Sequence, residues 1–196
     1  KNFFGLGEHV PTTALFKHPD TKHEHSVMAL VPNASNIIPG STSHDSNSAL
    51  IGAGDAGQVD KMAIMDTVLG QSDRNRFNYL ITKEHPGVHL IDNALTFNYD
   101  EEGKVPTYLS DYHNAKKQKF DEAKMHPEAL KWVLKLDPFA LGAELTAQGV
   151  HQSLANKAVV RLLSMQSEVV MGKNKTSDIL FAHGKYAFKP VHREVG

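Results

Sequence analysis

Two carboxylates and an amide stand close together in the middle of this chain. Asp73 begins the run Asp-Arg-Asn-Arg-Phe, Asn78 follows five positions later, and Asp92 comes directly after Val-His-Leu-Ile. Carboxylate and amide oxygens are donors that Mg²⁺ prefers, and a further carboxylate can orient an acceptor hydroxyl. Transfer of a phosphoryl group from ATP needs little more than this on one side of a site. The residue types therefore predict Asp73 as the group that faces the acceptor, and Asn78 and Asp92 as ligands of Mg²⁺ or Mn²⁺.

A β-hairpin is expected to bring the amide and the second carboxylate together. Segments 78–82 and 88–91 are rich in β-branched and aromatic residues, and the five residues between them include Pro and Gly. If Thr82 pairs with the first residue of the second segment, Asn78 lies opposite Asp92, with Cβ atoms roughly 5 Å apart. A slip of one residue would separate the two ligands.

A helix is predicted just before the first carboxylate. Asp55 and Gln58 have the spacing of a capping box, and Gly70 is placed to end the helix. Asp66 lies on a helical stripe with four apolar residues, which are Val59, Met62, Ala63 and Leu69. A carboxylate on such a stripe needs polar partners. Two interpretations stay open for Asp66: support for the loop that carries Asp73, through its backbone or Arg74, or a solvated position at the helix end.

The rest of the chain divides into a strand-rich beginning and a helical end. Residues 1–38 are expected to form short strands, and a polar, Ser-rich loop follows at 41–54. Four helices are then expected: 109–123, Pro127 to Lys135, a helix capped by Asp137 and ending near Gly149, and 153–172 as the longest. The lysines of the first of these form either a solvated face or a contact with anionic lipid headgroups; they are Lys116, Lys117 and Lys119.

Composition excludes several classes of function. The chain has 196 residues, 40% of them hydrophobic, which suits a single core. A net charge of −1 lacks the basic footprint of a nucleic-acid partner. Without cysteine, disulfides and thiolate zinc sites are excluded. The twelve histidines show no zinc-site spacing, so His18, His23 and His25 are interpreted as solvated loop residues. No apolar run approaches the ~18 residues of a membrane span, which favours a cytoplasmic location, with peripheral membrane contact or secretion left open.

Two stretches in the middle of the chain resemble a known family. Residues 65–81, from Met-Asp-Thr-Val-Leu to Asn-Tyr-Leu-Ile, and residues 90–97, Leu-Ile-Asp-Asn-Ala-Leu-Thr-Phe, look like the catalytic segments of phosphatidylinositol 3-/4-kinase-like enzymes. The type II phosphatidylinositol 4-kinases are the most similar, over about residues 58–98. The resemblance implies Asp73 as catalytic aspartate with Arg74 beside it, Asn78 and Asp92 as metal ligands, and Asp66 as support for them.

The same resemblance implies an α+β, protein-kinase-like fold. Residues 39–196 would form mainly the helical large lobe with its catalytic hairpin, and residues 1–38 the end of the small lobe and the hinge. The backbone at Val27, Ala29 and Val31 would then bind the adenine of ATP.

The chain also departs from the family pattern. Asn75 and Ala94 replace glycines, and neither a glycine-rich phosphate loop nor the strand lysine is present. Since the chain begins with Lys1, it is expected to be a piece of a larger protein, with the N-terminal lobe supplied by the rest of the chain or by another fragment.

The residues and the resemblance together predict an ATP-dependent kinase. Phosphatidylinositol is the expected acceptor by resemblance alone. Two alternatives stay open: an atypical protein Ser/Thr kinase, and a catalytically inactive kinase-like binding module.

Overall fold

The structure, a computed structural model, combines helices with two small sheets and is of the α+β class. It describes residues 3–6, 10–11, 13–17, 24–34, 56–71, 78–82, 88–91, 97 and 122–182. The strands are β1 (Thr13–Lys17), β2 (Glu24–Met28), β3 (Tyr79–Ile81) and β4 (Val88–Leu90). The helices are α2 (Ala56–Leu69), α4 (Pro127–Lys135), α5 (Pro138–Ala147), α6 (Gln152–Val170) and α7 (Thr176–Leu180).

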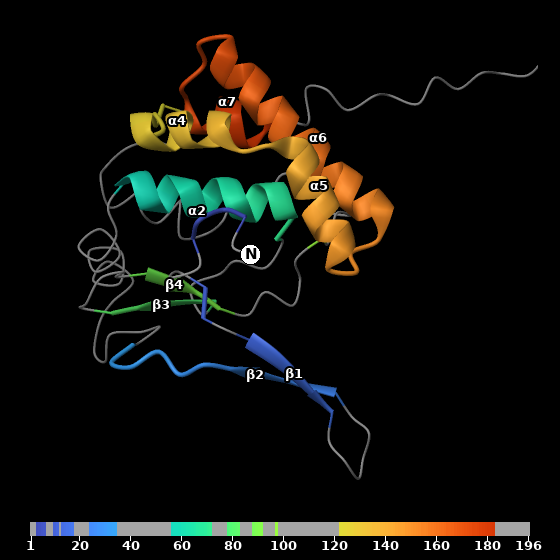
Figure 1. Ribbon diagram of the computed structural model, residues 1–196. Coiled ribbons are helices and arrows are strands. Elements are labelled where there is room, and N and C mark those ends of the chain that lie inside the picture. Colours follow the sequence, from blue (N-terminus) through green and yellow to red (C-terminus); the bar gives the residue numbers. More distant parts are fainter. Residues whose placement is uncertain are drawn as a thin grey trace, which may run out of the picture.

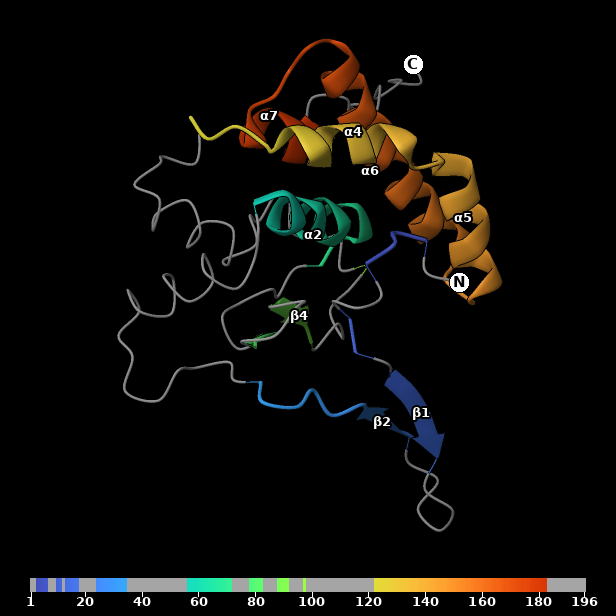
Figure 2. The same ribbon diagram turned by 60° about the vertical axis from the view of Figure 1, so that its left-hand side comes forward.

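These elements are arranged in layers around α2. Helices α4, α6 and α7 lie on one side of α2, and the β3–β4 hairpin lies on its other side (Figure 1). The β1–β2 hairpin lies beyond β3–β4, and the turned view shows the same order (Figure 2). The two hairpins are separate antiparallel pairs rather than parts of one sheet. The main core forms where α2 meets its neighbours on both sides.

Helix α2 is enclosed on every side. Its four consecutive residues 62–65 are all buried, and together they cover a full helical turn. It packs against α4, α6 and α7. The single stripe predicted from the sequence was therefore incomplete, because Ile64, Met65 and Val68 are buried as well. A helix that is apolar nearly all round is one that other elements surround.

The C-terminal end of α2 has the predicted glycine cap. Gly70 adopts a φ of +67°. The Gln71 N–H donates to the Asp66 carbonyl at 2.9 Å, and the Gly70 N–H donates to the Thr67 carbonyl at 3.2 Å. This pair of hydrogen bonds is a Schellman motif, which ends the helix sharply and satisfies two of its last carbonyls.

Helices α4, α5 and α6 match the predicted bounds to within a few residues. Helix α4 begins at Pro127 and ends at Lys135, as predicted. The N-cap of α5 is Asp137, whose carboxylate accepts hydrogen bonds from two backbone N–H groups, those of Phe139 at 2.9 Å and Ala140 at 3.1 Å. Helix α6, with 19 residues, is the longest among the described residues. The short helix α7 had no counterpart in the sequence analysis.

Predictions for the N-terminal strands, for His25 and for the first of the four helices had different outcomes. One of the short strands expected within residues 1–38 is β2, which begins at Glu24 and ends at Met28. His25, assigned to a loop, is therefore part of a strand. The helix predicted at 109–123 does not reach its expected end, because residues 122 and 123 are not helical. Its remainder, with the lysines, and the loop at 41–54 lie outside the described residues.

Candidate functional site

The β3–β4 hairpin exists, but its register differs by one residue from the prediction. Ile81 pairs with Val88, Leu80 with His89, and Tyr79 with Leu90. The prediction of a Thr82–Val88 pair was wrong. In the observed register the residue opposite Asn78 is Ile91, and the Ile91 N–H donates to the Asn78 carbonyl at 3.0 Å. Asn78 is thus not directly opposite Asp92.

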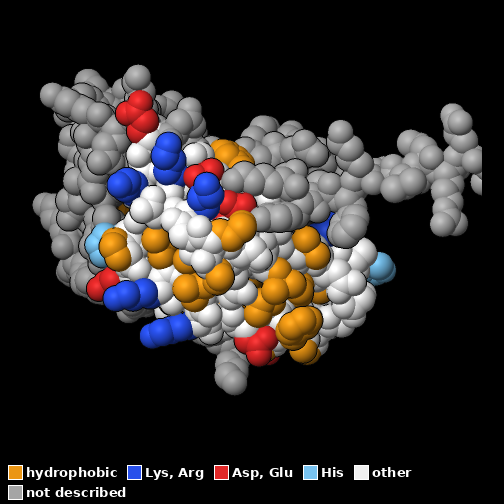
Figure 3. All heavy atoms as spheres, turned by 90° about the horizontal axis from the view of Figure 1, so that it is seen from above, with side chains coloured by type: hydrophobic (Ala, Val, Ile, Leu, Met, Phe, Trp, Pro, Cys, Tyr) orange, Lys and Arg blue, Asp and Glu red, His pale blue; other side chains and the backbone are white. Residues whose placement is uncertain are grey.

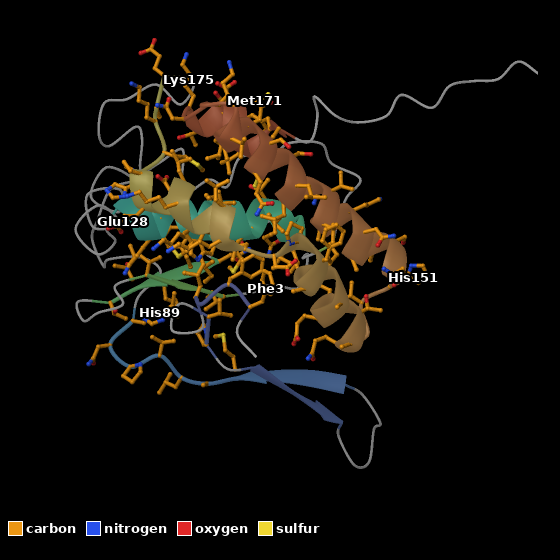
Figure 4. All side chains as sticks on the ribbon, turned by 45° about the horizontal axis from the view of Figure 1, so that its top comes forward. Phe3, His89, Glu128, His151, Met171 and Lys175 are labelled. Carbon is orange, nitrogen blue, oxygen red and sulfur yellow. The ribbon has the colours of Figure 1, made fainter. Side chains whose placement is uncertain are left out.

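Burial explains which register wins. Tyr79, Val88 and Leu90 are buried, whereas Leu80 and His89 on the alternate positions are only half-buried. Figure 4 shows the labelled His89 on the hairpin. Since paired residues share a face, the observed register puts Tyr79 and Leu90 together against the core. The predicted register would have paired Leu80 with Leu90 and turned Tyr79 to the other face.

Two backbone hydrogen bonds involve the residues that flank the segments carrying Asp73 and Asp92. The segment 72–77, which contains Asp73, leaves α2 at Gln71 and ends at Asn78. The segment 92–96, which begins with Asp92, leaves the hairpin at Ile91 and ends at Phe97. The Asn78–Ile91 bond joins the two segments at one end, and at the other the Phe97 N–H donates to the Leu69 carbonyl at 2.9 Å. Both segments are therefore anchored between β3–β4 and the C-terminal end of α2.

The backbone at Phe97 is unusual. Its φ is +68°, in the left-handed region that bulky side chains rarely adopt. Such conformations persist only where the surrounding structure holds them. At Phe97 the hydrogen bond to Leu69 is one contact that does so. The chain thus turns back sharply to α2 just after the segment that begins with Asp92.

Polar residues near this place are buried. Asp66 is 2% exposed, so the interpretation of a solvated helix-end carboxylate was wrong. Gln71 and Asn78 are buried too. Buried polar side chains of this kind need hydrogen-bond partners, so they constrain the structure around them. Burial at Asp66 fits the other interpretation, in which its carboxylate supports the neighbouring loop.

The sequence analysis missed Arg161. This α6 residue is half-buried, and its Nη1 donates to the Thr67 carbonyl in the last turn of α2 at 3.4 Å. A cation at this end of a helix interacts favourably with the helix dipole. Arg161 lies 94 positions from Thr67 along the chain, so nothing local could have indicated the contact.

A second missed residue is Asp60. Its carboxylate is buried and accepts a hydrogen bond from the His126 N–H at 2.6 Å, which joins α2 to the start of α4. Asp60 is a second carboxylate on α2 besides Asp66, and its position on a helix with many apolar residues was a signal in the sequence that the predictions did not use.

The structure places only some of the predicted site residues. Asn78 and Asp66 are described and lie on either side of segment 72–77. Asp73, Arg74 and Asp92 lie outside the described residues. Within the described ranges no three His, Asp or Glu side chains gather as a metal site. The two predicted ligands offer oxygen donors only, a set that suits a hard cation such as Mg²⁺.

The three residues predicted to bind adenine lie around the end of β2. Val27 is in the strand and pairs with Ala14. Ala29, just past the strand end, is exposed, and Val31 is half-buried before a turn in which Asn33 has a φ of 55°. Among the described residues, none forms a hydrogen bond with the backbone of Ala29 or Val31.

No helix in the described part of the chain has both the length and the apolar character to cross a bilayer. Comparisons with protein-family models, with curated proteins and with solved structures gave no match to this chain.

Proposed function

We propose that this chain is the catalytic part of an ATP-dependent kinase, and that phosphatidylinositol is its acceptor. The observation that carries the proposal is the pair of hydrogen bonds, Asn78 to Ile91 and Leu69 to Phe97, which brackets both candidate segments. Because Asp92 follows Ile91 directly, it is one residue away from the hydrogen bond that Asn78 accepts. Asp73 is two residues from Gln71, at the end of α2.

Each residue has a role in the proposal. Asp73 orients the acceptor hydroxyl and takes up its proton, with Arg74 beside it. Asn78 and Asp92 hold Mg²⁺, which supplies positive charge to the phosphate oxygens. Asp66 and Arg161 act on the last turn of α2, from which segment 72–77 starts, and so keep Asp73 in position. Catalysis of this kind depends on positioning and charge rather than on covalent chemistry.

The end of β2 offers a place for the nucleotide. In the proposal the backbone N–H and C=O groups of Ala29 and Val31 bind the adenine edge, and within the described residues no hydrogen bond involves them. The side chain of Val31 is apolar and half-buried, which suits contact with the face of a purine ring. A kinase acting on phosphatidylinositol would meet its acceptor by peripheral contact with a membrane.

A transfer assay tests the proposal. The longest natural form of the protein is incubated with labelled ATP and Mg²⁺, with phosphatidylinositol vesicles and a generic protein substrate in parallel, and Asp73→Ala serves as the blank. We expect label in the lipid that disappears in the blank. Label in protein alone would replace the lipid acceptor by a protein hydroxyl. Absence of label from both, with intact protein that binds ATP, would overturn the kinase and leave a nucleotide-binding module.

A further inference from the structure

The outer face of α6 carries an exposed row of apolar residues. Val160, Leu163 and Val170 are 52%, 39% and 76% exposed, with Ser167 between the last two. These four positions follow the 3-4-3 spacing of the a and d positions of a heptad. They span eleven residues of helix, which is about 15 Å for ten steps of 1.5 Å each. The row is a seam of the kind by which one helix pairs with another.

Neighbouring helices extend this seam. The side chain of Gln166 donates to the carbonyls of Val133 and Leu136, at 2.9 and 2.8 Å, and so fixes the end of α4 beside α6. Leu134 on α4 and Phe139 on α5 are exposed as well, Phe139 at 74%. Figure 3 shows apolar side chains gathered over this face of the helices. We call the exposed set Leu134, Phe139, Val160, Leu163 and Val170 the outer seam.

Charge around the outer seam is one-sided. Residues 151–175 contain four basic residues, Lys157, Arg161, Lys173 and Lys175, and a single acidic one, Glu168, which is buried. Lys131 and Lys135 on α4 are exposed next to Leu134. The exposed carboxylate of Asp137 is used to cap α5, and that of Glu144 bonds Gln148. The exposed residues of α6 thus include Lys157 and no carboxylate, and the exposed Lys173 and Lys175 follow shortly after the helix ends.

We propose that the outer seam is a docking surface for an acidic amphipathic helix of a partner protein. Apolar residues of that helix at a and d positions would cover Val160, Leu163 and Val170, and carboxylates beside them would face the lysines. A second copy of this chain fits poorly, because a two-fold pairing of this face would set its basic residues against themselves. Helices α4 and α6, which carry most of the seam, lie on the side of α2 away from the β3–β4 hairpin (Figures 1 and 2). A partner helix bound at the outer seam would leave the hairpin side of the molecule open. A bilayer bound at the outer seam would lie away from the proposed kinase site, so the choice of a helix over a bilayer rests on the proposed function.

A peptide titration tests this surface without any assay of transfer. The probe is a labelled synthetic peptide of about three heptads, with Leu at a and d and Glu at e and g, and its control replaces each Glu with Lys. Binding to the full chain is followed by fluorescence anisotropy. The variants are Leu163→Asp and Val170→Asp, each checked for an unchanged thermal melting midpoint. The matched control is Asn33→Asp, which adds the same charge at an exposed turn outside the helices and keeps a residue type that tolerates its φ of 55°.

We expect the Glu peptide to bind the wild-type chain and the Lys peptide to bind much more weakly. Leu163→Asp and Val170→Asp should each weaken binding of the Glu peptide by about tenfold or more, whereas Asn33→Asp stays within about twofold. The proposal is overturned if the Glu and Lys peptides bind equally well. It is also overturned if Leu163→Asp and Val170→Asp both bind the Glu peptide as tightly as the wild-type chain does. Two further arms identify a different occupant and also overturn it. These are binding to anionic phosphatidylserine vesicles that Leu163→Asp abolishes, and a dimer in sedimentation that becomes monomeric in Leu163→Asp. Failure of the transfer assay leaves these results unaffected, so the two proposals fail separately.

Discussion

The interactions that determine helices α4, α5 and α6 join residues close in sequence, whereas those that determine the β3–β4 hairpin join residues far apart in sequence. The start of α5 is determined by Asp137 and the N–H groups two and three residues later. The register of the hairpin is determined by which strand residues are buried against the core around α2. The helices are thus defined by neighbours in sequence, and the hairpin by neighbours in space. The candidate site belongs to the second kind of region, so its exact geometry could not be obtained by counting residues.

The largest difference expected between the two regions is in activity. Asp92→Asn removes a charge proposed to hold Mg²⁺ and should reduce phosphoryl transfer by about a thousandfold or more, with little change in stability. Asp137→Asn makes the same chemical change in the helical region. It should leave transfer within about twofold, because Asn caps a helix as well as Asp does. Initial rates of labelled phosphate transfer, with melting midpoints alongside, measure both. Transfer that survives Asp92→Asn would remove Asp92 from the site.

The next largest effect concerns two carboxylates that cap backbone N–H groups. Asp60 is buried and bonds His126 across the fold, whereas Asp137 is exposed and bonds within its own helix. Asp60→Ala should cost about 1–3 kcal/mol because it leaves a part-buried N–H without its partner. Asp137→Ala should cost about 1 kcal/mol. Urea denaturation measures both free energies of unfolding. If Asp137→Ala and Asp60→Ala lower the free energy of unfolding equally, a hydrogen bond between distant segments contributes no more than one within a helix.

Two glycine caps allow the same perturbation in each region. Gly70 ends α2 with a φ of +67°, and Gly149 follows α5 with a φ of +86°. Replacing either by Ala should cost about 1–2 kcal/mol, because a Cβ disfavours this backbone conformation. Only Gly70→Ala should also lower transfer, since segment 72–77 starts from that cap. Unfolding free energies matched to transfer rates test this. An equal loss of transfer in Gly149→Ala would mean that stability alone controls activity.

The smallest expected effect lies in the α5–α6 contact. A Cβ on Gly142 would stand 2.9 Å from Cγ2 of Val159, a short and stiff side chain. Gly142→Ala should therefore destabilise the protein by about 1 kcal/mol, despite the helical preference for Ala. In a Val159→Ala background the same change should instead stabilise by about 0.5–1 kcal/mol. Thermal and urea unfolding of the four proteins completes this cycle. If the sign does not change, close packing is not the reason for this glycine.

How much of the site could be predicted follows the same division. The end of α2 at Gly70 and the strands on both sides of residues 83–87 were predicted, because glycine, proline and alternation are local signals. The register was predicted wrongly, with Asn78 opposite Asp92, because either register satisfies the alternation within each strand. Only the burial of Tyr79 with Leu90 distinguishes them. Asp66 was left between two interpretations, and its burial removed one of them.

By itself, the sequence determined where most of the described helices and strands lie, and it identified Asp73, Asn78 and Asp92 as the residues whose types suit phosphoryl transfer. Caps, glycines and apolar spacing act over a few residues, so they can be read along the chain. Tertiary structure alone decided the hairpin register, the burial of Asp60 and Asp66, and the contact of Arg161 with α2. It also decided that most of α2 is buried while Val160, Leu163 and Val170 on α6 are exposed. Those features depend on which surfaces meet, and burial of apolar area against distant elements outweighs what any short segment prefers.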